Sequence, residues 1–246
     1  MERNKLNILG VAVDKVDRKG AMAAYKELLT REGCDLIVTP NSEIVVRAGE
    51  DEELARILKE AALVIPDGIG LVYASRILKD PLTERVTGVD FLSDILADAA
   101  KEGYGVYILG SKPGTADAAA EAMKKAYPGL IISGTHHGYF KPEEERALAE
   151  EIGRSGARFL CVALGAPKQE KFVEAYKDIL NVRCAMGVGG SLDVWAGNVK
   201  RAPEFYQKHG LEWLYRLLQE PSRIGRMMAL PVFMLRVIFS KKEKKQ

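Results

Sequence analysis

The chain of 246 residues predicts an α/β fold: a doubly wound, mainly parallel sheet with helices on both faces, plus a small helical C-terminal appendage. Short apolar runs alternate with segments of helical spacing, which is the pattern of a sheet built from strand–helix units. The runs are apolar throughout, as strands covered by helices on both sides must be. With 47% hydrophobic and 28% charged residues, the chain has the composition of one sizeable core.

Seven apolar runs are expected to form the strands, at residues 6–13, 36–38, 62–65, 106–109, 130–132, 159–164 and 182–186. Segments with helical spacing lie between them, at 54–61, 114–127, 142–154 and 167–180. Pro142 and Pro167 are each followed by acidic residues, which suit the first turn of a helix.

The pattern changes near Gly197, which divides the chain into an α/β core at 1–196 and an appendage at 197–246. The appendage predicts short amphipathic helices broken at Pro221 and Pro231. From 201 onward it carries ten basic and four acidic residues, a net charge of +6 within a total of +2, so the rest of the chain carries −4. A basic, apolar tail on a mildly acidic core indicates a partner of its own.

The overall charge of +2 argues against a general nucleic-acid binder. The N-terminus lacks the pattern of a signal peptide, and no run approaches the roughly 20 apolar residues that span a bilayer. Cys34, Cys161 and Cys184 are isolated and lie in or beside apolar runs, so we expect buried thiols in a reducing cytoplasm.

Small, polar or charged residues follow six successive predicted strands. In an open parallel sheet, ligands bind beyond the carboxyl ends of the strands, so these loops predict a polar ligand site. The loops lie at residues 39–42, 66–68, 110–114, 133–140, 165–170 and 187–193.

Asp67 is the sharpest candidate for acid–base chemistry, because a carboxylate just beyond a buried strand is partly desolvated and its pKa rises toward that of a general base. The alternative is a helix N-cap or a turn residue before Gly68. The local sequence leaves both interpretations open.

Two glycine-rich loops are candidates for phosphate contact. Residues 110–114 lead into a helix, where backbone N–H groups and Lys112 can meet a phosphate, although the loop is not a P-loop. Residues 187–190 begin like a dinucleotide fingerprint, but Leu192 stands where the third glycine belongs. A tight turn explains that loop equally well, and the departure counts against a nicotinamide enzyme.

The sequence predicts no metal and no cofactor. His136 and His137 are adjacent and lack a third ligand at metal spacing, and no pair of aspartates has the D-x-D spacing of many nucleotide-sugar enzymes. A diphosphate leaving group would then need arginine or lysine. Arg216, Arg223 and Arg226 of the appendage fit phosphate binding beside a membrane, or a solvated face in which Glu212 pairs with Arg216.

Five motifs together resemble the WecG/TagA/CpsF glycosyltransferases of bacteria over roughly the first four-fifths of the chain, and the basic tail is most like that of the TagA branch. They are Thr39-Pro40-Asn41, Pro66-Asp67-Gly68-Ile69-Gly70, Arg85-Val86-Thr87-Gly88, Gly165-Ala166-Pro167-Lys168-Gln169-Glu170 and Gly187-Val188-Gly189-Gly190.

The resemblance implies metal-independent, inverting transfer of N-acetylmannosamine from UDP to N-acetylglucosamine on undecaprenyl diphosphate, in synthesis of the wall teichoic acid linkage unit. It implies an enzyme on the inner face of the cell membrane, held by the appendage. Asp67 matches the general base. The resemblance assigns substrate binding to Thr39, Asn41, Arg85, Gln169, Arg216, Arg223 and Arg226, and UDP binding to Gly110, Lys112, Tyr139, Gly187, Gly190 and Asp193.

Other functions stay open at this point. A related transferase would use another UDP-hexose or UDP-N-acetylmannosaminuronic acid for a different surface polysaccharide. A nucleotide-dependent oxidoreductase would use the same kind of sheet, and a non-catalytic protein would bind the membrane surface through its tail. Away from the membrane, the apolar tail would dock on a second copy of the chain.

Overall fold

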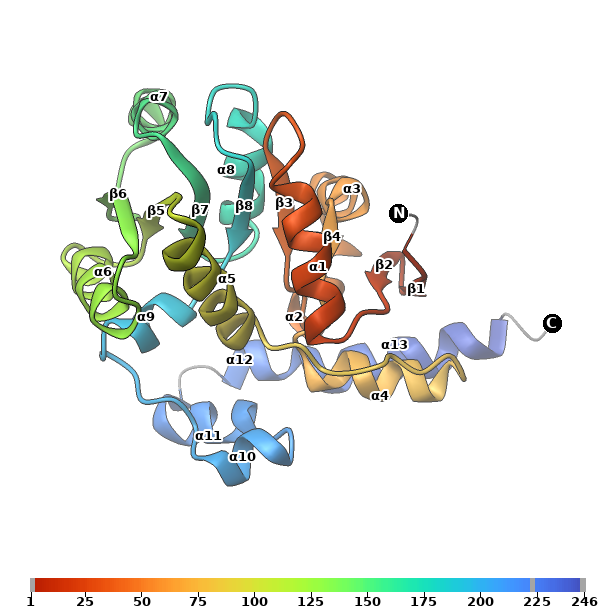
Figure 1. Ribbon diagram of the computed structural model, residues 1–246. Coiled ribbons are helices and arrows are strands. Elements are labelled where there is room, and N and C mark those ends of the chain that lie inside the picture. The colour runs from red at the N-terminus through yellow and green to blue at the C-terminus, as the bar shows by residue number, and fades with distance from the viewer. Residues whose placement is uncertain (1–2, 222–223, 244–246) are drawn as a thin grey trace.

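The computed structural model describes residues 3–221 and 224–243, without the side chains of residues 226, 242 and 243. Its centre is a six-stranded, all-parallel sheet in the order β4-β3-β8-β7-β5-β6 (Figure 1). The strands are β3 Asp35–Val38, β4 Leu63–Val64, β5 Gly105–Gly110, β6 Ile131–His136, β7 Ala157–Ala163 and β8 Cys184–Gly187. The predicted parallel sheet is therefore confirmed, and six of the seven apolar runs form its strands.

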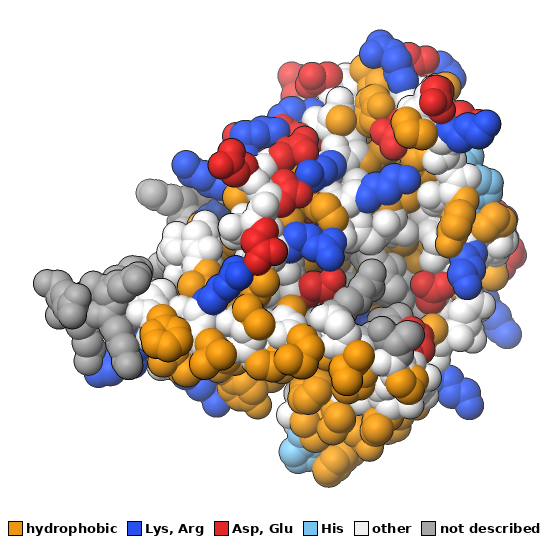
Figure 2. Space-filling view, turned by 180° about the vertical axis from the view of Figure 1, so that it is seen from behind, with side chains coloured by type: hydrophobic (Ala, Val, Ile, Leu, Met, Phe, Trp, Pro, Cys, Tyr) orange, Lys and Arg blue, Asp and Glu red, His pale blue; other side chains and the backbone are white. Residues whose placement is uncertain are grey.

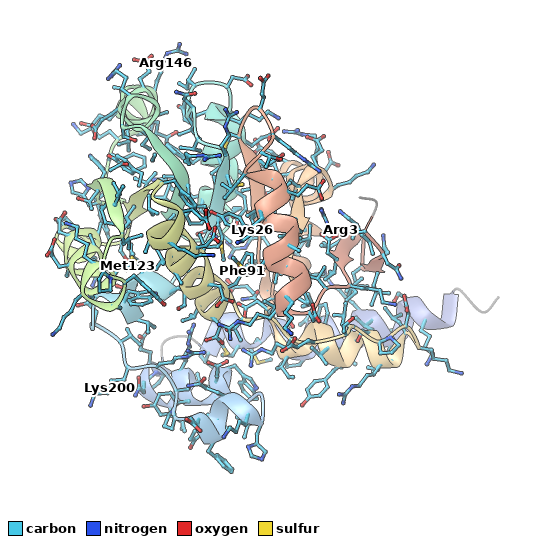
Figure 3. All side chains as sticks on the ribbon, viewed as in Figure 1. Arg3, Lys26, Phe91, Met123, Arg146 and Lys200 are labelled. Atoms are coloured by element: carbon cyan, nitrogen blue, oxygen red, sulfur yellow. The ribbon has the colours of Figure 1, made fainter. Side chains whose placement is uncertain are left out.

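Helices cover both faces of the sheet, as predicted. Alternate strand residues enter different cores: Ile37 packs with α1, α5 and α6, whereas Leu36 and Val38 pack with α2, α3, α7 and α8. On the first face, the side chains of Phe91 and Met123 are fully buried, while Arg146 on the opposite face is exposed (Figure 3). The helices are α1 Arg18–Leu28, α2 Ser42–Ala48, α3 Glu52–Glu60, α4 Ile69–Ile77, α5 Gly88–Glu102, α6 Thr115–Ala126, the 3₁₀ turn η1 Pro142–Glu144, α7 Glu145–Arg154 and α8 Lys168–Tyr176.

The first apolar run corrects the sequence prediction, because it forms a separate antiparallel hairpin of β1 Lys5–Ile8 and β2 Val11–Asp14. Leu9 and Gly10 between them have φ of 52° and 93°, the left-handed pair of a tight hairpin turn. The chain therefore reverses inside a run that looked continuous. The buried carboxylate of Asp14 ties the hairpin to the sheet, since it accepts from the backbone N–H of Val64 at 2.8 Å.

The cysteines follow the expectation in part. Cys161 and Cys184 are buried free thiols, whereas Cys34 is only partly buried. Desolvation of the Cys34 thiol, together with the negative charge of Asp35, still raises its pKa to about 12.

Helices follow the sheet to the end of the chain, as predicted, but Pro231 does not break them. It lies in the first turn of the last helix, where a proline leaves no additional N–H unsatisfied. These helices are α9 Ser191–Trp195, α10 Glu204–Lys208, α11 Glu212–Gln219, α12 Ile224–Met227 and α13 Ala229–Glu243.

The last helix, α13, returns to the sheet region and packs along α2 and α4 (Figure 1). Phe233 and Val237, one turn apart, are fully buried in the same core as β3 and β4. Arg236 adds an ion pair to Glu50 at 2.8 Å, just beyond the end of α2. In the part of the chain that the structure describes, no helix is long and apolar enough to cross a membrane.

The packing of α13 predicts unequal effects of two truncations on one helix. Phe233→Ala should lower the free energy of unfolding by about 3–5 kcal/mol, because it removes a fully buried ring. Leu235→Ala, at a position 55% exposed, should change it by no more than about 0.5 kcal/mol. Urea denaturation measures both values, and similar effects of the two substitutions would contradict the packing of α13 on the core.

Candidate active site

The six polar loops lie at one edge of the sheet, because all six strands are parallel and each loop follows a carboxyl end. Across that edge, the loop after β4 brings Asp67, the loop after β3 brings Thr39, and β8 ends in Gly187. The sheet order makes these three strands neighbours. Residues far apart in the sequence are thereby brought together without any long-range signal in the sequence itself.

Asp67 is not the cap of the helix that follows it. The N-cap of α4 is Gly68, and no side chain caps that helix. The Asp67 carboxylate instead accepts a hydrogen bond from the backbone N–H of Gly88, the first residue of α5. The carboxylate thus faces the N-terminus of a 15-residue helix, where the helix dipole favours negative charge.

Burial raises the pKa of the Asp67 carboxyl, although the residue as a whole is only half-buried. The positive charges of Arg85 and Arg216 and the Gly88 N–H oppose that rise, and the negative charge of Glu212 adds to it. Desolvation is the largest of these influences. A carboxylate with raised proton affinity, at the edge of the sheet where ligands bind, has the properties of a general base.

Arg85 joins the loop after β4 to the C-terminal helices. Its Nε donates to the backbone carbonyl of Asp67 at 2.6 Å, and its Nη2 forms an ion pair with Glu212 of α11. One of the two interpretations of the appendage arginines paired Glu212 with Arg216, but the ion pair that the structure describes for Glu212 is with Arg85. Both side chains are largely buried, so this contact is better shielded from water than a surface ion pair.

Thr39 and Asn41 occupy the loop after β3. The Thr39 hydroxyl lies 3.5 Å from the carbonyl oxygen of Gly187, and a Cβ at Gly88 would be 3.2 Å from it. Asn41 caps α2, since its Oδ1 accepts from the Ile44 N–H at 3.0 Å. Asn41 also lies against Gly68, where a Cβ would come within 3.0 Å of its Cα. The Asn41 side chain therefore helps to shape the loop that holds Asp67.

Gln169 and Glu170 form a buried polar pair at the start of α8, next to Gly187. The Gln169 Nε2 donates to Glu170 Oε1 at 2.8 Å, and a Cβ at Gly187 would lie 2.3 Å from that Nε2. Gln169 was a candidate from the sequence, and Glu170 was expected as an acid in the first turn of a helix, where the structure places it. Its burial was not expected: Glu170 is 2% exposed, and burial raises the pKa of its carboxyl. Nothing in the local sequence separates a buried acid from a solvated one in a first turn.

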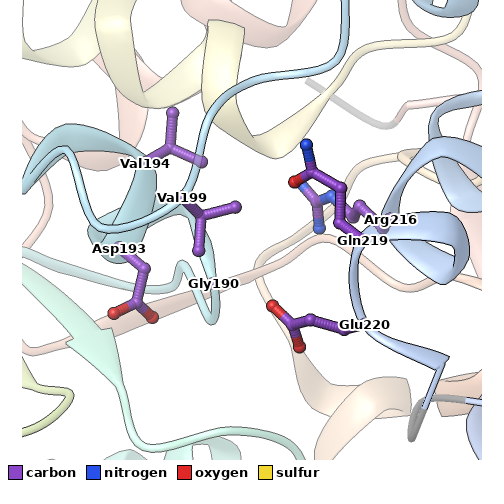
Figure 4. A pocket seen from close by; sticks show the side chains of 7 residues that line it. All are labelled: Gly190, Asp193, Val194, Val199, Arg216, Gln219 and Glu220. Atoms are coloured by element: carbon purple, nitrogen blue, oxygen red, sulfur yellow. The ribbon is translucent and has the colours of Figure 1, made fainter.

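A cleft between α9 and α11 collects three more candidates, Gly190, Asp193 and Arg216. Figure 4 shows Asp193 and Val199 on one side and the α11 residues Arg216 and Gln219 on the other, with Glu220 just beyond the helix. Asp193 accepts from the hydroxyl of Ser111, in the loop after β5, at 3.1 Å. Ser111 was not among the predicted site residues. The cleft is lined by two carboxylates, Asp193 and Glu220, which can accept from hydroxyl groups, and by one arginine, Arg216, which can bind phosphate.

The remaining predicted residues are less closely grouped. Gly110 has φ of 131°, and a Cβ there would lie 2.4 Å from the Ala163 carbonyl oxygen, so β5 and β7 can approach only at a glycine. The side chains of Lys112 and Tyr139 are exposed and do not enter a buried cluster. Arg223 and the side chain of Arg226 lie outside the described residues. In the part of the chain that is described, no group of three or more His, Cys, Asp or Glu side chains forms a metal site.

The raised pKa of Asp67 predicts the sign of its effect on stability. Because the folded protein disfavours the ionised carboxyl, stability falls as pH rises from the ordinary aspartate pKa through the raised one, and stays lower above it. Asp67→Asn should therefore be at least as stable as wild type at neutral pH, with a difference that shrinks in acid. Thermal unfolding from acid to neutral pH measures this.

Asp51 provides the opposite control, because its hydrogen bond from Lys171 lowers the pKa of its carboxyl. Its stabilising effect is present at neutral pH and is lost as pH falls through the lowered pKa, so Asp51→Asn should lose stability at neutral pH. Destabilisation of Asp67→Asn at neutral pH would contradict the burial argument.

Comparisons with known proteins address the whole chain. Residues 6–246 match the model of the glycosyl transferase WecG/TagA/CpsF family. A protein of Bacillus spizizenii is 37% identical over 82% of this chain and 78% of its own length. A protein of Staphylococcus aureus is 33% identical over 98% of this chain and 95% of its own length. Both carry the name N-acetylglucosaminyldiphosphoundecaprenol N-acetyl-beta-D-mannosaminyltransferase. The chain therefore belongs to the WecG/TagA/CpsF family and is a glycosyltransferase.

Proposed function

We propose that this enzyme transfers N-acetylmannosamine from UDP-N-acetylmannosamine to N-acetylglucosamine on undecaprenyl diphosphate, in synthesis of the wall teichoic acid linkage unit. The names of the two relatives support this donor and acceptor at 33% and 37% identity. Membership of a glycosyltransferase family argues against the oxidoreductase interpretation. The 187–190 loop also argues against it, because the helix that follows, α9, has only five residues. Family membership also replaces the purely membrane-binding interpretation.

One observation carries the proposal most directly: the carboxylate of Asp67, at the junction of the sheet and the C-terminal helices, has a raised pKa and feels the positive charges of Arg85 and Arg216. In the proposed reaction, Asp67 takes the proton from an acceptor hydroxyl as that oxygen bonds to the anomeric carbon of the donor sugar. The bond from that carbon to the diphosphate oxygen breaks, and UDP leaves with the electron pair. A single displacement inverts the anomeric configuration and needs only one base.

We propose that UDP binds along the surface at Gly190, Asp193 and Arg216, where the cleft itself, of about 20 Å³, takes only a small part of the nucleotide. Arg216 also contributes positive charge at Asp67, so the cleft is electrostatically connected to the proposed base. Arg216 can therefore stabilise the negative charge that develops on the leaving diphosphate. We extend this role to Arg223 and Arg226 and propose Lys112 and Tyr139 as outer contacts to the nucleotide.

The exposed face of α13 supports a membrane surface as the partner of the C-terminal helices. Val232, Leu235 and Phe239 repeat at helical spacing and are 37%, 55% and 58% exposed, opposite the buried Phe233 and Val237. Figure 2 shows hydrophobic side chains gathered along the lower edge of the molecule. This apolar face belongs to the basic C-terminal segment, and the two properties together suit the interface of an anionic membrane. A lipid-linked acceptor is found at the same interface. We propose a peripheral location at the inner face of the cell membrane.

Transfer assays with a panel of UDP-sugars and a lipid-diphosphate N-acetylglucosamine acceptor test the proposed reaction. We expect UDP-N-acetylmannosamine to be the preferred donor, without added metal, and Asp67→Asn to lose about 10²–10⁴-fold in kcat, the usual contribution of a positioned base. Preference for another UDP-hexose or for the uronic acid would reassign the enzyme within its family. Near-normal turnover of a folded Asp67→Asn variant would show that Asp67 is not the base.

Vesicle sedimentation tests the membrane surface. Leu235→Asp should weaken binding to vesicles of anionic phospholipid, because it places a charge on the proposed apolar face. Ile131→Asp, at a position 48% exposed on the edge strand β6, should bind as wild type does. If Leu235→Asp bound vesicles normally and instead abolished a dimer in solution, this face would be a contact between two copies.

A further inference from the structure

Two buried oxygen atoms at the start of α8 have no hydrogen-bond partner in the described part of the chain: Gln169 Oε1 and Glu170 Oε2. Their side chains are only 5% and 2% exposed. Buried polar atoms are rarely left unsatisfied in a native protein, since each one loses its hydrogen bonds to water and gains nothing in return. The unsatisfied Gln169 Oε1, at the carboxyl edge of the sheet, therefore indicates a missing partner for that atom.

The pair has a defined orientation. Gln169 Nε2 donates to Glu170 Oε1 at 2.8 Å, which directs the amide nitrogen toward Glu170 and leaves the amide oxygen as an unused acceptor. The amide is also held against the end of β8, where a Cβ at Gly187 would come within 2.3 Å of Nε2. Gly187 and Glu170 thus confine the amide from two sides.

Short contacts connect the pair with the proposed base. From Gln169 the path crosses Gly187, whose carbonyl oxygen lies 3.5 Å from the Thr39 hydroxyl. Thr39 packs against Gly88, and the Gly88 N–H donates to the Asp67 carboxylate. The amide and the proposed base therefore lie at the same edge of the sheet, where this glycosyltransferase must hold a sugar, and sugars bring hydroxyl and acetamido N–H donors.

We propose that Glu170 is a positioning residue, which orients the Gln169 amide so that its Oε1 accepts a hydrogen bond from a hydroxyl or amide N–H of the donor sugar. Glu170 does not touch the substrate and acts only through Gln169. The nearby Arg47 belongs to the support of this loop, because it donates to the Ala166 carbonyl at 2.7 Å and forms an ion pair with Glu43 at 3.6 Å. The inference rests on the proposed function, since it assumes a sugar nucleotide as donor.

The main test uses Glu170→Met, which fills the buried space without an acceptor for Gln169. We expect its kcat/KM for the UDP-sugar to fall about tenfold, the scale of one hydrogen bond to an uncharged group. Affinity for UDP alone, measured by calorimetry, should stay at the wild-type value. Glu170→Gln keeps an acceptor oxygen for the Gln169 amide, so it should retain most of the activity that Glu170→Met loses. If the negative charge of Glu170 were required, Glu170→Gln would lose activity as well.

A double-mutant cycle separates positioning from a purely structural role. In a Gln169→Met background, Glu170→Met should cause no further loss of kcat/KM, because Glu170 then has no amide to orient. Losses that multiply would overturn the proposal, as would normal kinetics in Glu170→Met or an equal loss of affinity for UDP and UDP-sugar. Thermal unfolding of every variant shows whether the fold is kept.

If Glu170→Met does not fold, Gln169→Met tests the same amide directly. It removes the Oε1 acceptor, and we expect weaker binding of UDP-sugar with unchanged binding of UDP. Unchanged binding of both ligands would overturn the proposal. If the wild-type enzyme transferred no sugar, the proposed function would fail, whereas the difference between UDP-sugar and UDP binding would still decide the role of Glu170.

Discussion

The burial of one negative charge, on Asp67, is the constraint on which the arrangement of the site depends. A carboxylate in this position must be compensated, and the compensation comes from separate parts of the chain: the Gly88 N–H at the start of α5, Arg85, and Arg216 of α11. None of these groups neutralises Asp67 completely, because desolvation still outweighs them and the pKa remains raised. That imbalance is useful to a base, since a fully paired carboxylate would have little affinity for a proton.

Arg85 links the buried charge of Asp67 to the packing of the C-terminal helices. It holds the Asp67 carbonyl and pairs with Glu212, so the C-terminal helices are attached directly to the loop that carries the carboxylate. Glu212 also raises the proton affinity of Asp67 through its own charge. Docking of α11 thus influences both the position and the basicity of the proposed catalytic group.

The sequence predicted those features that depend on local pattern. Buried parallel strands are continuous apolar runs, and residues just after them must lie at one edge, so Asp67, Thr39 and Gly187 could be located from spacing alone. The hairpin at 5–14 was missed because a glycine inside an apolar run permits either a strand or a reversal. The burial of Glu170 and the pairing of Arg85 with Glu212 depend on tertiary packing between distant segments, which no local pattern contains. The family resemblance, in turn, supplied roles for arginines that composition alone leaves as a solvated face.

The two faces of α13 relate the membrane proposal to the chemistry. Its buried face packs on α2 and α4, and both helices begin in loops of the site, α2 at its cap Asn41 and α4 at Gly68, directly after Asp67. Its other face exposes Val232, Leu235 and Phe239. A rigid helix packed in this way fixes the distance between its exposed face and Asp67, because protein cores are close-packed and transmit displacements. If that face lies on the membrane, an acceptor whose diphosphate stays at the lipid surface meets the base at a defined depth. The fold would then select a lipid-linked acceptor by geometry, in addition to any contacts with its sugar.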